Sequence, residues 1–254
     1  MPDAILAHPR LAEIYDRVDD DRSDLAAYLS AVEEFHAHTL LDIGCGTGTF
    51  ACLLAARGVA VTAVDPALAS LEVARRKDHD NAVQWIHGDA TTLPSLAVDM
   101  ATMTGNVAQV FLSDEEWTAT LRGAHQALRT GGRLVFEVRD PERRAWEAWT
   151  TTEPRHVVVP NLGLVEVSEE VIDVSLPLIS FRMTFRFAGD GAVITSDSTL
   201  RFRTREEIEE SLSAAGFRTD EIRDAPDRPG LEFVFVARAE SITVMSEPSR
   251  LDRT

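Results

Sequence analysis

Three glycines at alternate positions follow a short apolar run early in the chain. The run Leu40-Leu-Asp-Ile continues into Gly44-Cys-Gly46-Thr-Gly48. Glycines at such a place let the backbone turn sharply, and they let a ligand sit against main-chain N–H groups where a helix begins. Cys45 has no histidine to partner it in the sequence, so it is interpreted as a small loop residue rather than a nucleophile. The pattern predicts a ligand-binding loop, with a purely structural turn as the alternative.

The spacing of the glycines narrows the class of ligand. A dinucleotide-binding loop has glycine at the sixth position of GxGxxG, where this chain has Thr49. A phosphate-binding P-loop requires Gly-Lys-Ser/Thr, and this loop contains no lysine. The loop instead reads GxGxG and follows an acidic residue, Asp42. Both common phosphate-binding loops are therefore disfavoured.

Two more carboxylates follow the next two expected strands. Asp65 lies 21 residues after Gly44, where a carboxylate can accept both hydroxyls of a ribose, and Asp89 follows the third strand, where it could accept an exocyclic amine. Asp65 could also be the N-cap of a helix with Pro66 at its first position, and Asp89 could only stabilise its own loop. Three carboxylates would repel a pyrophosphate and suit a cationic nucleoside.

With these motifs the sequence resembles the class I S-adenosylmethionine-dependent methyltransferases. The resemblance implies S-adenosyl-L-methionine as cofactor and a Rossmann-like fold, an α/β doubly wound, mostly parallel sheet of seven strands. It covers roughly residues 35–140 and 204–237. The motifs that carry it are Asp42-Ile-Gly-Cys-Gly-Thr-Gly48, Val64-Asp65-Pro66, Gly88-Asp89-Ala90, Met103-Thr104-Gly105-Asn106 and Gly131-Gly132.

The resemblance also implies roles for individual residues. The glycine loop would hold the methionyl group, Asp65 the ribose and Asp89 the adenine amine, while Thr104 and Asn106 would line the wall near the methyl group. The chain departs from the family in the next helix, which has Ala67 and Ser70 where relatives often carry a small hydroxyl residue and methionine. The cofactor-binding set implied in this way is Tyr15, Asp42, Gly44, Cys45, Gly46, Gly48, Asp65, Pro66, Asp89, Ala90, Thr104 and Asn106.

The elements that must position these residues alternate between strands and helices. Continuous apolar runs are typical of strands buried on both faces of a parallel sheet. The expected strands are 39–43, 60–64, 83–86, 100–103 and 133–138, and the expected helices are 23–35, 49–57, 66–76 and one that begins at the Ser113–Glu116 capping box and ends at Gly131-Gly132. This order predicts right-handed βαβ units in a doubly wound sheet.

After Pro141 the alternation of strands and helices stops, and the sequence pattern becomes typical of antiparallel strands. Aromatic and polar residues alternate over 179–187, a Gly-Asp-Gly turn follows, and 193–202 returns as a partner strand. We therefore expect a core at 1–153, an antiparallel β insertion at 154–203, a closing helix and strand at 204–239, and a flexible tail at 240–254. The phenylalanine stripe at 181–187 is interpreted as core or as a homodimer surface, with an acceptor-pocket wall as the alternative.

Composition restricts the partners and the location. The 254 residues carry a formal net charge of −17, which disfavours nucleic-acid binding and docking on anionic membranes. No apolar run approaches the roughly 20 residues that span a bilayer, and no secretory signal is visible. The two cysteines form no zinc-binding spacing, so we expect no metal. A cytoplasmic enzyme is the expectation.

Taken together, these features predict methyl transfer to oxygen or nitrogen of a small-molecule acceptor by in-line displacement. Orientation is the main catalytic task in such a reaction, so the sequence identifies no catalytic base. A non-catalytic cofactor-binding module and an NAD-type dehydrogenase are the alternatives. Candidate acceptor-side residues are Asn106, Gln109, Glu137, Arg139, His156 and Arg182.

Overall fold

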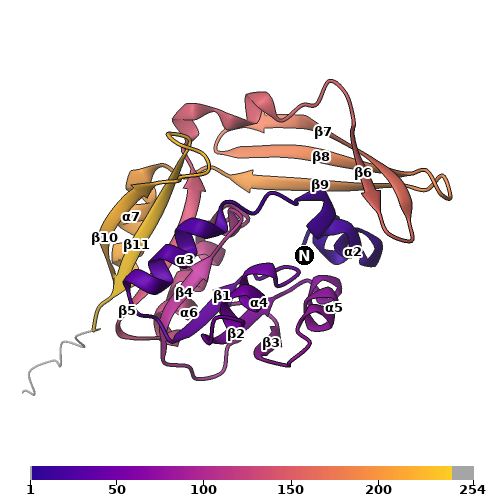
Figure 1. The fold of residues 1–254 in the computed structure, drawn as a ribbon. Coiled ribbons are helices and arrows are strands. Elements are labelled where there is room, and N and C mark those ends of the chain that lie inside the picture. Colours follow the sequence, from indigo (N-terminus) through magenta and orange to yellow (C-terminus); the bar gives the residue numbers. More distant parts are fainter. Residues whose placement is uncertain (1, 242–254) are drawn as a thin grey trace, which may run out of the picture.

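The structure, a computed structural model, describes residues 2–241 and consists of two sheets with helices around the larger one (Figure 1). The larger sheet has seven strands in the order β10-β11-β5-β4-β1-β2-β3, and only β11 runs against its two neighbours. This confirms the expected mostly parallel α/β fold. Its strands are β1 (Thr39–Ile43), β2 (Ala60–Asp65), β3 (Val83–His87), β4 (Val98–Met103), β5 (Leu128–Arg139), β10 (Phe217–Asp224) and β11 (Glu232–Ala239).

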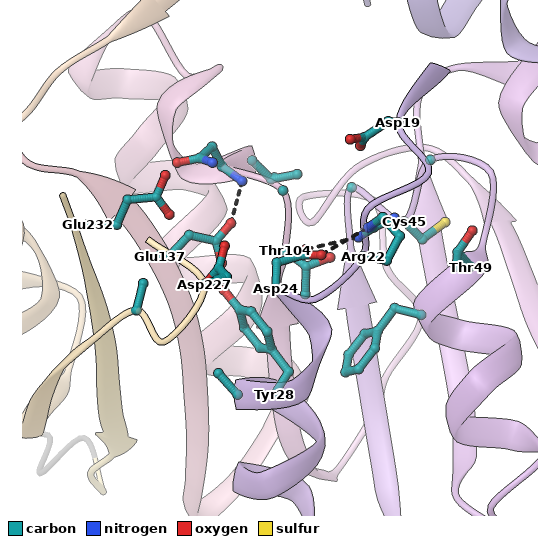
Figure 2. Close-up of a pocket in the computed structure, with 18 of the residues that line it drawn as sticks. Asp19, Arg22, Asp24, Tyr28, Cys45, Thr49, Thr104, Glu137, Asp227 and Glu232 are labelled. Atoms are coloured by element: carbon teal, nitrogen blue, oxygen red, sulfur yellow. Dashed lines mark hydrogen bonds and ion pairs between the residues drawn. The ribbon is translucent and has the colours of Figure 1, made fainter. Parts of the chain in front are cut away.

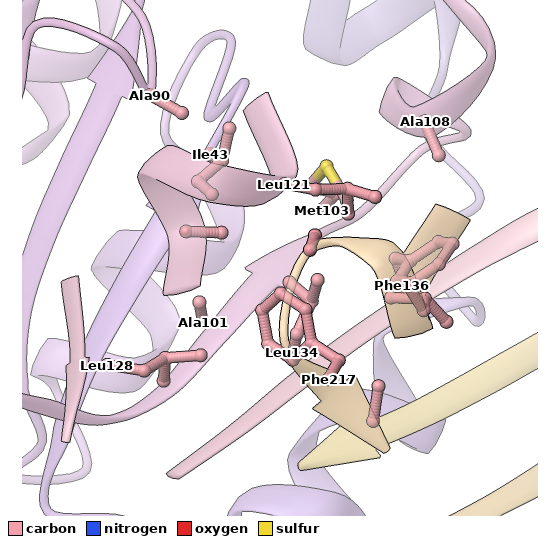
Figure 3. Close-up of a cluster of buried hydrophobic side chains, with 14 of the residues drawn as sticks. Ile43, Ala90, Ala101, Met103, Ala108, Leu121, Leu128, Leu134, Phe136 and Phe217 are labelled. Atoms are coloured by element: carbon pink, nitrogen blue, oxygen red, sulfur yellow. The ribbon is translucent and has the colours of Figure 1, made fainter. Parts of the chain in front are cut away.

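Alternate side chains of this sheet enter two separate cores, which is what a doubly wound sheet requires. On β5, Leu134 and Phe136 pack with α6 and α7, and Figure 3 shows part of this cluster. Val135 faces the opposite core, under α3 and α4. The helices are α1 (Ala4–Ala7), α2 (Pro9–Val18), α3 (Leu25–Glu34), α4 (Thr49–Ala55), α5 (Leu68–Lys77), α6 (Asp114–Ala127) and α7 (Arg205–Ala214), with short 3-10 turns at Val107–Gln109, Pro141–Arg143 and Ala145–Ala148.

Helix starts follow the sequence more closely than helix ends. Ser113 and Thr204 each form a complete capping box, as their spacing predicts. The expected stop at Gly131-Gly132 is wrong, because α6 ends at Ala127 and β5 begins at Leu128, so both glycines lie within the strand. Gly131 has a φ of +80°, and the pairing of β5 with β4 is irregular between Leu128 and Arg133, so this glycine forms a bend within the strand after the helix has already ended.

The second sheet is antiparallel and packs on the N-terminal helices. Its strands are β6 (Arg155–Val159), β7 (Gly163–Ser175), β8 (Leu178–Phe187) and β9 (Val193–Arg201). Phe185 and Phe187 are buried against Leu11 and Ile14 of α2, which Figure 1 shows beside this sheet. The other side of α2 packs through Ala12 against α5. The expected antiparallel sheet is therefore confirmed, and these two phenylalanines are core.

The order of the strands defines one switch point. The chain proceeds outward from β1 through β2 and β3, then returns to build β4 and β5 on the other side of β1. Loops that follow β1 and β4 therefore diverge at the same edge of the sheet, which is where open α/β sheets bind ligands. No helix within residues 2–241 is long and apolar enough to cross a membrane. The expected flexible tail falls almost wholly on residues 242–254, which lie outside the described part.

Candidate functional site

The glycine loop forms the floor of the site at this switch point. Gly44, Gly46 and Gly48 have φ of +72°, +52° and +77°, a region that other residues adopt at a cost. A Cβ on Gly44 would lie 2.6 Å from the Val107 side chain, and one on Gly48 would lie 2.4 Å from the Trp85 ring. A Cβ on Gly46 would meet no atom within 4 Å. The outer glycines are therefore required by packing, whereas Gly46 presents bare backbone to open space.

Asp65 holds this loop in place. Its two carboxylate oxygens accept hydrogen bonds from Gly46 N at 2.8 Å and from Ala67 N at 2.7 Å. Burial raises the pKa of this carboxyl, and the two backbone donors oppose that rise. The interpretation of Asp65 as a helix N-cap with Pro66 at the first position is wrong, because α5 begins at Leu68 after Ala67. The Asp65 carboxylate therefore fixes the backbone of the glycine loop through these hydrogen bonds.

Asp42 lies deeper, in the middle of the sheet. One of its oxygens accepts a hydrogen bond from the Thr102 hydroxyl at 3.1 Å, and the other has no partner among residues 2–241. Burial raises the pKa of Asp42 to about 7, and the nearby Asp65 carboxylate adds to the rise. Asp42 is thus a carboxyl group that is only partly ionised at pH 7.

Asp89 and Ala90 follow β3 and have different surroundings. The Asp89 carboxylate is exposed and accepts hydrogen bonds from the amide and hydroxyl of Thr91. Ala90 is buried, and its carbonyl oxygen would lie 2.0 Å from a Cβ placed on Gly123 of α6. Close packing of α6 therefore fixes the turn that presents Asp89.

A cavity of about 280 Å³ opens beside the glycine loop. Figure 2 shows Cys45 and Thr49 on one side of it and Glu137, Asp227 and Glu232 on the other. Six residues of the expected cofactor set contribute to its wall, namely Tyr15, Gly44, Cys45, Gly46, Thr104 and Asn106. The other six, which do not line it, are Asp42, Gly48, Asp65, Pro66, Asp89 and Ala90.

The N-terminal segment closes one side of this cavity, a contribution that the sequence pattern did not reveal beyond Tyr15. Arg22 forms a two-point ion pair with Asp24, both distances being 3.1 Å. The Tyr15 hydroxyl donates to Asp19 at 3.4 Å, and burial raises the pKa of the phenol. These residues lie in a helix and a turn without a recognisable motif, so only the folded chain brings them to the site.

The acceptor-side candidates separate into two groups. Asn106, Glu137 and Arg139 line the cavity. Gln109 does not, because its buried amide bridges Arg139 N at 3.2 Å and Arg201 O at 3.4 Å. These two contacts make Gln109 a structural residue.

His156 and Arg182 are also absent from the cavity wall, as are all other residues of β6–β9. His156 is exposed and lies 3.5 Å from Glu166 on the neighbouring strand, and Arg182 pairs with Asp197 at 2.6 Å on an exposed face. The expectation that they approach the acceptor is wrong for this cavity, because the strand alternation directs both side chains away from the buried face of the sheet.

Comparison with known proteins relates part of the chain to one family. Residues 40–132 match the sequence model of a family described as a methyltransferase domain. This part of the chain is similar to methyltransferase domains. A curated relative, the cypemycin N-terminal methyltransferase of a Streptomyces species, is 34% identical over 149 residues, which cover 56% of this chain and 61% of the relative. A demethylmenaquinone methyltransferase of Clavibacter sepedonicus is 33% identical over 50% of this chain and 54% of its own length.

Solved structures support the same fold over most of the chain. A sugar N-methyltransferase of a Streptoalloteichus species has a TM-score of 0.74 at 20% identity, covering 89% of this chain and 91% of that one. An S-adenosylmethionine-dependent methyltransferase of Clostridium acetobutylicum has a TM-score of 0.73 at 15% identity, covering 91% and 98%. The chain spans about half to six tenths of the curated relatives named above, so the likeness is to part of those proteins and not to the whole of them.

The chemistry of the residues at this site fits S-adenosyl-L-methionine. Gly46 leaves open backbone where a ligand can approach, and two orphaned buried oxygens, Asn106 Oδ1 and Glu137 Oε2, lie on the cavity wall. Carboxyl groups outnumber guanidinium groups on that wall, which suits a cofactor with a sulfonium and an amino group. A pyrophosphate would be disfavoured by the same charges.

Proposed function

We propose that this protein transfers a methyl group from S-adenosyl-L-methionine to oxygen or nitrogen of a small-molecule acceptor, leaving S-adenosyl-L-homocysteine. The observation that carries the proposal is the cavity beside the glycine loop, at the switch point between β1 and β4. The likeness to relatives named as methyltransferases supports it. The net charge of −17 favours a small acceptor over a nucleic acid.

Specific residues would hold the cofactor in this proposal. The backbone at Gly44 and Gly46 would cradle the methionyl group, Asp65 would accept from the ribose, and Asp89 would accept from the adenine amine. Asp65 has one further lone pair on each oxygen after its two backbone bonds. Arg22, which lies on the cavity wall, is the candidate counterion for the methionyl carboxylate.

The cofactor supplies an electrophilic methyl group on a sulfonium. The protein would orient the acceptor against it and exclude water from the cavity. Thr104 and Asn106 follow β4 at the cavity wall, where they would orient the acceptor against the methyl group. Orientation of this kind supplies up to roughly 7–11 kcal/mol in well-aligned reactions. The segment from Tyr15 to Tyr28 covers the cavity from the N-terminal side and would exclude water.

The division of the chain follows from the same interpretation. We propose that 1–153 and 204–239 form one cofactor-binding core and that 154–203 is an insertion into it. The pairing of β11 with β5 supports a single core, because the chain returns after the insertion to the strand that it left. The cytoplasmic location and a homodimer stay predictions.

Calorimetric titration with S-adenosyl-L-homocysteine tests the cofactor assignment. We expect Asp65→Ala to weaken binding by about 1–3 kcal/mol, through lost charge-assisted hydrogen bonds and a loosened Gly46. Asp80→Ala, which removes an exposed carboxylate, is the control and should leave binding unchanged. An unchanged dissociation constant for a folded Asp65→Ala protein would count against the ribose role. Tritiated-methyl transfer to bulk tRNA or DNA, with none to metabolite pools, would overturn the small-molecule acceptor.

A further inference from the structure

Glu137 is a buried carboxyl group with one oxygen left unused. Its side chain comes from β5 and faces the α3 side of the sheet, next to Val135 in the strand alternation. The residue is 4% exposed. Oε1 accepts a hydrogen bond from the Asn106 backbone N–H, while Oε2 has no partner among residues 2–241. A buried carboxyl oxygen without a donor is costly, so such an oxygen in a cavity wall points to a missing ligand.

No cation within the described chain neutralises Glu137. Arg139 pairs with Glu232 at 3.5 Å, and Arg228 pairs with the same carboxylate at 2.8 Å. Arg22 forms an ion pair with Asp24 at 3.1 Å. The three guanidinium groups on the cavity wall are thus already paired, and no basic side chain within residues 2–241 lies within 4 Å of the Glu137 carboxyl group.

The surroundings of Glu137 are acidic on several sides. Glu232 faces it from β11 and Asp24 from the start of α3, whereas Arg139 and the Asn106 amide oppose their effect. Figure 2 shows Glu137 between Glu232 and Asp24 at the cavity. Burial raises the pKa of Glu137 to about 8, and the two neighbouring carboxylates add to the rise. A carboxyl of this kind is matched to a proton exchange with an amine near neutral pH.

We propose that the acceptor of this protein is an amine and that Glu137 is the catalytic residue that binds it and removes its proton. Asn106 Oδ1, the second buried oxygen without a partner on the wall, would accept from the same amine. An alcohol brings one hydrogen-bond donor and no charge, so it would leave one of these two oxygens unpaired. This inference rests on the proposed methyltransferase function and names the class of its substrate.

The proposed step balances in protons and electrons. The ammonium form of the acceptor gives one proton to Glu137 Oε2, which frees the nitrogen lone pair. The nitrogen then bonds to the methyl carbon as the carbon–sulfur bond breaks, and that electron pair stays on sulfur. The product leaves as a methylated ammonium ion, and Glu137 returns its proton to water. One proton is released overall.

Binding of amine probes to the protein saturated with S-adenosyl-L-homocysteine tests the inference without turnover. The probes are matched pairs, benzylamine with benzyl alcohol and cyclohexylamine with cyclohexanol, titrated by calorimetry. We expect each amine to bind at least tenfold more tightly than its alcohol. Glu137→Gln should weaken the amine at least tenfold and the alcohol less than twofold, because glutamine can still accept from the Asn106 amide but presents an N–H₂ to the ligand.

Proton linkage supplies a second readout. Below pH 8 the free Glu137 carboxyl is mostly protonated, so binding an ammonium ion should release a proton and amine affinity should rise with pH up to about 8. Titrations at pH 7 in phosphate and in Tris should therefore give different apparent enthalpies for the wild type and equal ones for Glu137→Gln. Glu210→Gln, the same change at an exposed site on α7, is the control and should behave as the wild type.

The outcomes separate this inference from the proposed function. Failure of S-adenosyl-L-homocysteine to bind would refute the proposed function itself. Normal cofactor-product binding, with no amine preference in either pair or with a preference that Glu137→Gln retains, would overturn the amine assignment alone. Circular dichroism and urea unfolding of Glu137→Gln ensure that a loss of binding is not a loss of fold.

Discussion

Replacing Asp42 with asparagine should stabilise the protein at alkaline pH and make its stability less dependent on pH. Asp42 is 1% exposed, and its pKa rises from 3.8 to about 7 on folding. Because the folded state holds this proton more tightly, stability falls as pH rises from about 4 to about 7 and then levels off. A rise of about three units corresponds to roughly 4 kcal/mol above pH 7. Asparagine keeps an oxygen for the Thr102 hydroxyl and carries no charge to bury.

Urea unfolding at pH 4.5, 6 and 8 measures this effect. By the linkage relation, the free energy of unfolding of Asp42→Asn relative to the wild type should increase by roughly 3 kcal/mol from pH 4.5 to pH 8. Taking the difference between the two proteins cancels the contributions of groups that do not interact with Asp42, which leaves Asp42 itself and its interaction with Asp65. Parallel curves for the two proteins, differing by less than about 0.5 kcal/mol across this range, would refute the claim that Asp42 titrates in the folded state with a raised pKa.

Two further substitutions test how the site is built. Gly48→Ala should destabilise the fold by about 1–3 kcal/mol, because its Cβ would lie 2.4 Å from the Trp85 ring at a φ of +77°; an unfolding midpoint equal to that of the wild type would contradict this packing. Asp16→Asn should cost about 1 kcal/mol of stability and several-fold in affinity for S-adenosyl-L-homocysteine, because Asp16 ties α2 to the Thr47 hydroxyl and to Lys77 of α5 at 2.6 Å; titration of a variant with wild-type affinity would show that this tether does not shape the site.

The glycine loop beside the cavity was predictable because its signals are local in sequence. The glycine spacing predicts the loop between β1 and α4, since each positive φ is required within five residues of chain. Strand positions followed from apolar runs, and both capping boxes form as their residue types require. Local rules failed at Gly131, which has the left-handed φ expected of a helix-ending glycine but lies at an irregular point within β5, because α6 already ends at Ala127.

The acceptor side was only partly predictable because it is assembled from distant segments. Glu137 was identified as a candidate from its place at the end of β5, but Asp24, Asp227 and Glu232 carry no motif and meet it only through tertiary packing. In the antiparallel sheet, His156 and Arg182 were predicted to approach the acceptor because of their residue types, but both lie on an exposed face. Residue type alone does not distinguish a cavity wall from a solvated strand.

Two buried carboxyl groups with raised pKa values, Asp42 and Glu137, lie on either side of the switch point. Each lowers the stability of the free protein at neutral pH, since the fold must either bury a charge or hold a proton. A ligand that brings positive charge to this edge of the sheet reverses that cost, because it favours the ionised carboxyl groups that the empty fold disfavours. Binding of a cation thereby offsets the free energy that burial of these two carboxyl groups costs in folding. A neutral or anionic ligand does not offset this cost. In the proposed function, the same selectivity would favour both a sulfonium cofactor and an amine acceptor.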